Sequence, residues 1–292
     1  MASLDDLKKR ISSVKSTQKI TKAMKMVAAS KLRRAQESAE KGRPYSDKMN
    51  NIILNLSNSI TDKENSPKLL AGSGEDKVHL GIVMTSDRGL CGGFNTNIIK
   101  KAKLYFQKIL DEGKILKIIT VGSKGYDQLK RTYKDSIIEK ISFKESKYAN
   151  YFDADKVGKI IIDKFEKKEF DVCAIFYNQF KNVITQIPQE QQIIPLKTSV
   201  TKKESSFQDN YEFEPEEDEI LSNLLPKNIS TQIFKAMLEN SASEQGSRMS
   251  AMDNATRNAG EMVDKLTIEY NRSRQAAITK ELIEIISGAE SL

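Results

Sequence analysis

Several residue types are scarce in this sequence, and each scarcity narrows what the protein is able to do. Tryptophan is absent, histidine occurs once and cysteine twice among 292 residues. With His79 as the single histidine, a metal centre built on several histidines is excluded. Cys91 and Cys173 do not form a disulfide framework, which is typical of a reducing compartment. Only six prolines and fourteen glycines interrupt the chain, which favours long helices.

Long apolar runs and targeting signals are also lacking. No stretch of about 18 apolar residues occurs, so we expect no membrane-spanning helix. The first residues lack the apolar core of a signal peptide, and Asp5 and Asp6 are unusual in a transit peptide, so we expect neither. Charge, by contrast, is plentiful, with 30% charged residues and a net charge of +7. This balance is typical of long exposed helices and indicates an acidic partner, which is nucleic acid, an anionic membrane or acidic protein loops.

Residues 1–61 are predicted to form one long coiled-coil helix. Ser3 suits the N-cap, and Asp5 and Asp6 suit the first turn. Apolar residues then recur at the 3-4 spacing of a coiled-coil seam, with changes of phase that predict stutters. The predicted seam consists of Leu4, Leu7, Ile11, Val14, Ile20, Met24, Val27, Met49, Ile52, Leu56 and Ile60. Pro44 predicts a kink in this helix.

Residues 77–200 are predicted to form a central α/β domain. Short β-rich runs alternate there with helical patterns, which favours a parallel sheet. Residues 62–76 have the composition of a linker. The predicted strands are 78–84, 115–121, 137–141, 172–177, 183–187 and 193–196, and the predicted helices are 93–110, 124–131 and 155–165.

Residues 212–292 are predicted to carry the C-terminal coiled-coil helix, after an acidic linker over 198–219. A short helix is expected to end at Leu225, and Pro226 suits the first turn of the long helix. The predicted seam consists of Ile229, Ile233, Met237, Met249, Met252, Ala255, Ala259, Met262, Leu266, Tyr270 and Ala277. The fold predicted for the chain is therefore α/β plus coiled coil, with two long antiparallel terminal helices and a central Rossmann-like α/β domain.

An apolar stripe lies at the very end of the chain, where most chains fray. It consists of Ile278, Leu282, Ile285 and Ile286 on one side of a helix, and Gly288 suits the helix end. Such a stripe requires a cover.

One glycine-rich loop, Thr85–Asn95, lies between a predicted strand and a predicted helix, where α/β proteins bind phosphates. The GxGxxG spacing is missing, and no Lys-Ser/Thr pair ends the loop. We therefore interpret Asp87 and Arg88 as residues that brace the turn, and Gly122–Gly125 as a tight turn with a helix cap.

Catalysis has weak support elsewhere in the sequence. Cys91 has no neighbouring base to activate it as a nucleophile. The acidic run 212–219 lacks the glycine turn of a calcium loop and is interpreted as a solvated linker. The partner of the basic N-terminal helix is either a phosphate backbone or acidic protein surfaces, and its charge does not separate the two. Tyr45 is its one aromatic residue for stacking on bases.

Four ordered motifs resemble the gamma subunit of F-type ATP synthases, and the resemblance spans the whole chain. Residues 17–31 (TQKITKAMKMVAASK) are similar to the N-terminal signature of this family, and residues 86–93 (SDRGLCGG) to its central-domain hallmark. Residues 243–252 and 271–291 are similar to its C-terminal half and closing pattern.

The resemblance implies a function in which the chain is the rotating central shaft. Its helices are inserted into a ring of three alpha and three beta subunits, and its α/β domain lies near the epsilon subunit and the membrane c-ring. Proton flow turns the ring and shaft and drives ATP synthesis on beta, and the chain helps regulate ATPase activity. The chain itself is expected to be no enzyme and to bind no cofactor, metal or nucleic acid. We expect a bacterial protein, peripheral on the cytoplasmic side of the cell inner membrane without direct insertion.

The resemblance also implies contact residues for the alpha–beta head. Arg274 and Gln275 form the polar contact with a beta loop, with Thr279 and Glu281 nearby, and Met24 faces the lower beta region. We infer Lys22 and Lys25 as charge partners of an acidic beta loop. The stripe residues Ile278, Leu282, Ile285 and Ile286 are expected to be covered by the N-terminal helix on one side and by the ring on the other. Asp87, Arg88, Gly89, Gly92 and Gly93 are expected to form a structural loop.

Two rival interpretations compete with the shaft. One is a nucleotide-binding α/β protein with helical arms, and the other is a basic coiled-coil protein that acts on nucleic acid. Micromolar binding of ATP by the isolated chain is the sign of the first, and salt-dependent retention on DNA is the sign of the second.

Overall fold

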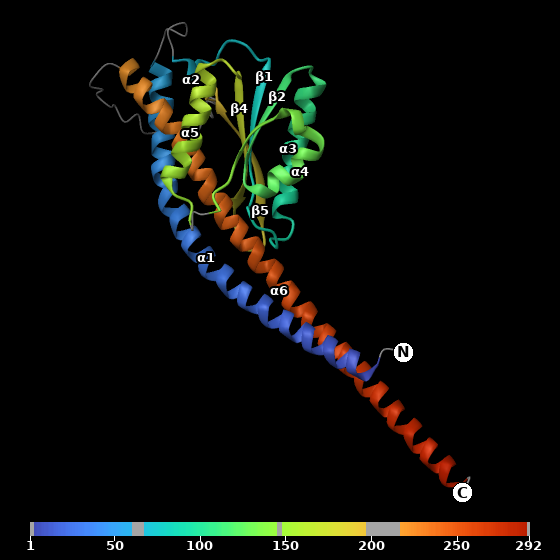
Figure 1. Cartoon of the computed structure of the whole chain (residues 1–292). Coiled ribbons are helices and arrows are strands. Elements are labelled where there is room, and N and C mark those ends of the chain that lie inside the picture. Colours follow the sequence, from blue (N-terminus) through green and yellow to red (C-terminus); the bar gives the residue numbers. More distant parts are fainter. Residues whose placement is uncertain (1–2, 60–66, 145–147, 197–216, 291–292) are drawn as a thin grey trace. The chain divides into compact units, whose positions relative to one another are not determined.

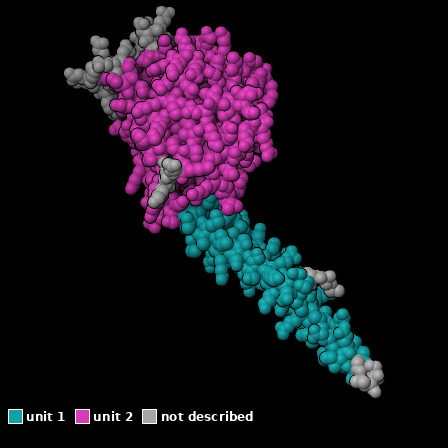
Figure 2. Space-filling model, in the orientation of Figure 1, with its two compact units in different colours: residues 1–29, 248–292 teal, residues 30–247 magenta. Residues whose placement is uncertain are grey.

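A computed structural model describes residues 3–59, 67–144, 148–196 and 217–290 (Figure 1). The chain divides into two compact units, residues 1–29 with 248–292 and residues 30–247, which Figure 2 shows in teal and magenta. The two longest helices, α1 (Leu4–Ser59) and α6 (Glu217–Glu290), contribute to both units. The acidic run 212–219 lies largely outside the described residues.

The larger unit contains a five-stranded sheet in the order β3-β2-β1-β4-β5. β1 pairs in parallel with β2 and β4, β2 pairs in parallel with β3, and β5 is antiparallel to β4. This order is that of a Rossmann-like sheet with an antiparallel edge strand. The strands are β1 (Val78–Met84), β2 (Ile115–Val121), β3 (Ile137–Ile141), β4 (Val172–Phe180) and β5 (Gln186–Ile194).

The first four strands confirm the prediction, but the fifth corrects it. Two separate strands were expected at 183–187 and 193–196, whereas β5 is continuous through the polar stretch Gln189–Gln192. An edge strand with one solvent-facing side tolerates such polar residues, which hide it from a search for apolar runs.

Helices cover both faces of the sheet, because successive strand residues point to opposite faces. On one face Val83, Ile118 and Phe176 pack against α3 (Phe94–Asp111) and α4 (Ser123–Tyr133). On the other, Ile82, Ile119 and Ile175 pack against α5 (Tyr151–Glu166) and the part of α6 around Ile229 and Ile233. The short helices are α2 (Lys68–Ala71), inside the predicted linker, and the 3-10 turn η1 (Lys134–Ser136).

One side of α1 shows an unbroken 3-4 alternation of buried or half-buried residues from Leu4 to Leu56. The predicted phase shift is wrong, since Ile20 and Val27 are 59% and 57% exposed. Polar and small residues continue the 3-4 spacing of the seam instead. The seam residues between Val14 and Met49 are Gln18, Thr21, Lys25, Ala28, Leu32, Ala35, Ala39, Gly42 and Ser46.

Helix α6 begins earlier than the sequence indicated. Pro226 was expected to start a new helix, but α6 runs through it from Glu217 to Glu290. Leu221, Leu225 and Ile229 are fully buried at a spacing of four residues. Their packing against α1 and the sheet outweighs the cost of about 3 kcal/mol for an internal proline. Pro44 likewise lies inside α1.

The two long helices run antiparallel within each unit. In the smaller unit Thr21 Oγ1 accepts a hydrogen bond of 2.8 Å from Thr256 Oγ1, and the Lys25 ammonium lies 2.6 Å from Asp253. In the larger unit Arg43 pairs with Glu239 and Asp47 pairs with Lys235. Rising numbers on α1 therefore meet falling numbers on α6, as expected for the antiparallel coiled coil. On α6 the 3-4 alternation runs from Met249 to Ala277, and the predicted seam residue Met262 lies outside it.

Candidate partner-binding site

The end of α6 extends past the start of α1 within the smaller unit. The pairs Thr21–Thr256 and Lys25–Asp253 set a register that places Leu4, the first residue of α1, opposite the region of Arg274. Every described side chain from Ile278 to Ser287 is exposed. The N-terminal helix therefore does not cover the terminal stripe, and this expectation was wrong.

The apolar stripe stays intact on this extension. Ile278, Leu282, Ile285 and Ile286 are 46%, 53%, 68% and 57% exposed. Leu282 lies four residues after Ile278, and Ile285 and Ile286 lie three and four residues after Leu282, so all four share one side of α6. A contiguous exposed apolar side on an otherwise charged helix is typical of a surface that binds another protein.

Polar candidates stand next to the stripe. Arg274, Gln275 and Glu281 are exposed, and the Thr279 hydroxyl donates to the Gln275 carbonyl at 2.9 Å. That internal bond is common for a helical threonine. Arg274 and Gln275 are at exposed positions outside the 3-4 alternation of α6. The structure thus brings the predicted contact residues of α6 together around the uncovered end.

The candidates on α1 differ in their availability. Lys22 is exposed and Met24 is half-buried. Lys25 lies in the seam, where its ammonium donates to Asp253 at 2.6 Å. This bond lowers the pKa of Asp253, and Arg257 adds a smaller effect. Asp253 was not foreseen as the partner of Lys25, although the heptad phase of α1 was the signal that could have identified it.

The glycine-rich loop is held together from inside the larger unit. Asp87 Oδ1 accepts from the Ser123 N–H, the Ser123 hydroxyl and the Ser142 hydroxyl, each at 2.8 Å. Asp87 Oδ2 accepts from the Phe143 N–H at 3.3 Å. Burial raises the pKa of Asp87, but these donors outweigh it and hold the pKa below its ordinary value. Asp87 thereby joins the segments that follow β1, β2 and β3.

The rest of the loop shows the same bracing. The buried Asn95 side chain accepts from the Ser86 N–H at 2.9 Å and donates to the Cys91 sulfur at 3.3 Å. Gly92 has a φ of 57°, a conformation that favours glycine. Gly93 precedes α3 as its N-cap, whereas a side chain at Gly89 would meet open space. The groups at this edge of the sheet therefore bind one another.

Two kinds of feature are absent from the residues that the structure describes. They hold no cluster of three or more histidine, cysteine or acidic side chains arranged to bind a metal. Over the same ranges, no helix combines the length and the apolar character that crossing a bilayer requires. Burial raises the pKa of the Cys173 thiol well above its ordinary value, which makes it a poor nucleophile.

The fold and these surfaces define a class of protein in which a small α/β domain accompanies a long antiparallel helix pair with an uncovered apolar end. Comparisons with known proteins are consistent with this class. The profile of a family described as ATP synthase matches residues 3–292. The chain is 87% identical over its full length to the complete ATP synthase gamma chain of Pelagibacter ubique (strain HTCC1062). It is 57% identical to that of Jannaschia sp. (strain CCS1), again with both chains fully covered.

Solved structures lead to the same family. A chain in the central stalk and c-ring structure of the Tetrahymena thermophila mitochondrial ATP synthase is 28% identical, with a TM-score of 0.62 over 81% of this chain and 99% of that one. A chain in an OSCP, F1 and c-ring structure of the Euglena gracilis enzyme shares the fold at 18% identity, with a TM-score of 0.69 over 99% of this chain and 94% of that one. The protein belongs to the ATP synthase gamma chain family.

Proposed function

We propose that this chain is the rotating central shaft of a proton-translocating ATP synthase. The observation that carries the proposal is the uncovered apolar side of α6 beyond Ala277. The seam residues before it, on α1 and α6, are buried or half-buried. A shaft that turns inside a sleeve needs an apolar end, because apolar contacts are non-directional and let one surface slip over another. The sleeve in this proposal is a ring of three alpha and three beta subunits.

Torque requires the opposite kind of contact. Contacts that are equal in every state of a beta subunit shift no equilibrium, whereas directional polar contacts distinguish one state from another. Arg274, Gln275, Thr279 and Glu281 are the polar residues beside the stripe that serve this purpose. On α1 the exposed Lys22 is the better candidate for an acidic beta loop, since Lys25 already has Asp253 as its partner.

The remaining parts of the proposal concern place and partners. The α/β domain lies toward the epsilon subunit and the c-ring, and the chain is peripheral on the cytoplasmic side of the cell inner membrane. ATP is made on the beta subunits, and proton flow supplies the torque. The loop around Asp87 supports this division of work, because the donors of Ser123 and Ser142 at the neighbouring strand ends are already bound to the Asp87 carboxylate.

The test is a pair of stripe variants in the assembled complex. Ile285→Ser and Ile286→Ser each remove an exposed apolar side chain, so the melting temperature of the isolated chain stays unchanged. In the complex each loses on the order of 1 kcal/mol of apolar contact, and ATP-driven proton pumping falls. Leu104→Ser is the matched control, because Leu104 is 68% exposed on α3, outside α6.

Two outcomes contradict the proposal. One is that the chain fails to enter a stoichiometric complex with its alpha and beta subunits. The other is that both stripe variants pump protons as well as the unsubstituted chain and the Leu104→Ser control.

A further inference from the structure

Strand β4 extends beyond the end of β1, one of the two strands that pair with it. The β1–β4 ladder runs from His79–Val172 to Val83–Phe176, whereas β4 continues to Phe180. Beyond Phe176, β1 therefore offers no backbone partners to β4. Unpaired backbone groups in a buried strand are costly, so the end of β4 needs partners from elsewhere.

Side chains of α6 take the place of the missing strand. Asn240 Oδ1 accepts from the Asn178 N–H at 3.2 Å, and the Ser243 hydroxyl donates to the Asn178 carbonyl at 2.9 Å. Glu239 Oε2 accepts from the Phe180 N–H at 3.0 Å. All three α6 side chains are buried. The helix thus continues the hydrogen bonding of the sheet at this end.

Glu239 also binds the other long helix. Its second oxygen, Oε1, accepts from Arg43 Nε at 2.8 Å and lies 2.7 Å from Arg43 Nη2. Only 3% of the Glu239 side chain is exposed, against 39% for Arg43, so the ion pair has a buried carboxylate and a partly exposed cation. One side chain therefore joins α1, α6 and β4.

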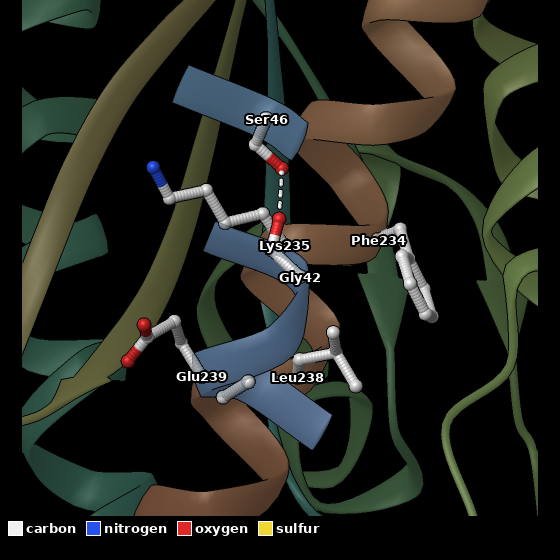
Figure 3. A pocket seen from close by; sticks show the side chains of 7 residues that line it. Gly42, Ser46, Phe234, Lys235, Leu238 and Glu239 are labelled. Carbon is white, nitrogen blue, oxygen red and sulfur yellow. Dashed lines mark hydrogen bonds between the residues drawn. The ribbon is translucent and has the colours of Figure 1, made fainter. Parts of the chain in front are cut away.

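The helices approach closely beside this ion pair. Figure 3 shows Gly42 of α1 next to Leu238 of α6, with Lys235 and Glu239 extending to one side and Phe234 to the other. A Cβ atom at Gly42 would lie 3.2 Å from Leu238 Cδ1. The cavity between these residues has about 10 Å³, the lower limit of what one water molecule needs. The ion pair thus lies beside a close helix contact.

We propose that Glu239, held by Arg43, is the residue that fastens the α/β domain to the helix pair against torque, which rests on the proposed function as a shaft. The apolar contacts of α6 with the sheet, at Ile229, Ile233 and Met237, are non-directional and permit sliding. The bonds of Glu239 are charge-assisted and fixed in direction, so they resist it. Glu239 is a positioning residue that acts between the domain and the helices.

The chain supplies its own control. Lys235 and Asp47 also join α6 to α1, at 2.8 Å, but Asp47 is 61% exposed and neither residue bonds to the sheet in the contacts described. Lys235→Met removes this exposed pair and leaves Glu239 in place. Arg43→Met also removes one cation, as Lys235→Met does, but here the cation is the partner of the buried Glu239 carboxylate.

Two measurements on the complete chain and the assembled complex test the proposal. In the complete chain, Arg43→Met leaves a buried carboxylate without its cation, and amide exchange at Phe180 accelerates roughly 100-fold. In the assembled complex the same variant pumps fewer protons for each ATP hydrolysed. Arg43→Lys restores one contact and part of the pumping, because a lysine cannot bind the carboxylate as a fork. Lys235→Met changes neither quantity.

The outcomes separate this proposal from the shaft itself. A merely structural role lowers the amount of assembled complex but leaves the protons pumped per ATP unchanged in what assembles. Full pumping per ATP in Arg43→Met, together with fast exchange at Phe180, overturns the role of Glu239 and leaves the shaft intact. If Arg43→Met does not assemble, full pumping per ATP in Arg43→Lys likewise overturns that role. A complex of the unsubstituted chain that hydrolyses ATP without pumping overturns both.

Discussion

Asp87 gives the sharpest test of the view that the glycine-rich loop is a structural brace. Asp87→Ala removes the acceptor of four hydrogen bonds, from the Ser123 N–H and hydroxyl, the Ser142 hydroxyl and the Phe143 N–H. These donors belong to the segments after β2 and β3, so the substitution removes the hydrogen bonds that join them to the segment after β1.

The size of the effect follows from which donors lose contact with water. Ser123 is buried, so its two donors stay without an acceptor, whereas the exposed Ser142 finds water. Two buried donors at about 1–1.5 kcal/mol each give a loss of about 2–3 kcal/mol in the free energy of unfolding. For a unit of this size we expect the melting temperature to fall by about 4–12 °C.

Calorimetry of the isolated chain measures this change, and Asp127→Ala is the matched control. Asp127 contacts Lys124 and Lys130 on the surface of α4, at 4.0 and 3.4 Å, so its loss costs less than about 1 kcal/mol. Equal melting temperatures for the two variants refute the brace. An Asp87→Ala chain that keeps its stability but loses micromolar binding of an anion would instead revive the nucleotide-binding interpretation.

Three further predictions concern acid, packing and the seam. Asp171 accepts from the Ser73 hydroxyl at 2.6 Å and from the Val78 N–H at 2.9 Å. Burial raises the pKa of Asp171, but its donors outweigh this effect, so the folded pKa values of both Asp87 and Asp171 lie below the ordinary 3.8. Their contribution to stability is present above that pH and lost as pH falls through the folded values, so melting temperatures should be steady from about pH 7 to 5 and drop below about pH 4, and a flat profile to pH 2 contradicts this. Gly81→Ala places a Cβ 2.8 Å from Phe106 Cζ and should cost about 1–3 kcal/mol in chemical denaturation, whereas Gly89→Ala, with open space, should not. Lys25→Ala should raise the pKa of Asp253 toward 3.8 in an NMR titration, and an unchanged titration argues against the pair.

Sequence patterns predicted the α/β domain well, because its strands are buried and rich in apolar residues. Val78–Met84 and Ile115–Val121 coincide with β1 and β2. The edge strand β5 was split in two, since Gln189–Gln192 break its apolar pattern. Pairing to β4, which no local pattern reveals, makes the polar stretch a strand.

The helix seam was harder to predict for the same reason. The heptad phase of α1 passes through Gln18, Thr21 and Lys25, which an apolar search skips in favour of Ile20 and Val27. Thr21 and Lys25 belong to the seam only because Thr256 and Asp253 meet them there. A polar seam residue is recognised from its partner, which lies more than 200 positions away in the sequence.

The sequence did not reveal which element covers the apolar stripe at the end of α6. The stripe Ile278–Ile286 was found from its spacing, but its cover was misassigned in part to α1. Register decides that question, and register depends on which residues of two distant helices pair. The contact roles of Arg274 and Gln275 remain predictions, because their partners belong to other chains.

The most direct test of the shaft is rotation of a probe fixed to the α/β domain in the assembled complex. Cys91 and Cys173 are 2% and 0% exposed, so a thiol introduced by Lys108→Cys, at a side chain 74% exposed on α3, is labelled selectively. With ATP, the probe should rotate in one direction relative to immobilised alpha and beta subunits. A complex that hydrolyses ATP at its full rate while the probe stays still contradicts the account.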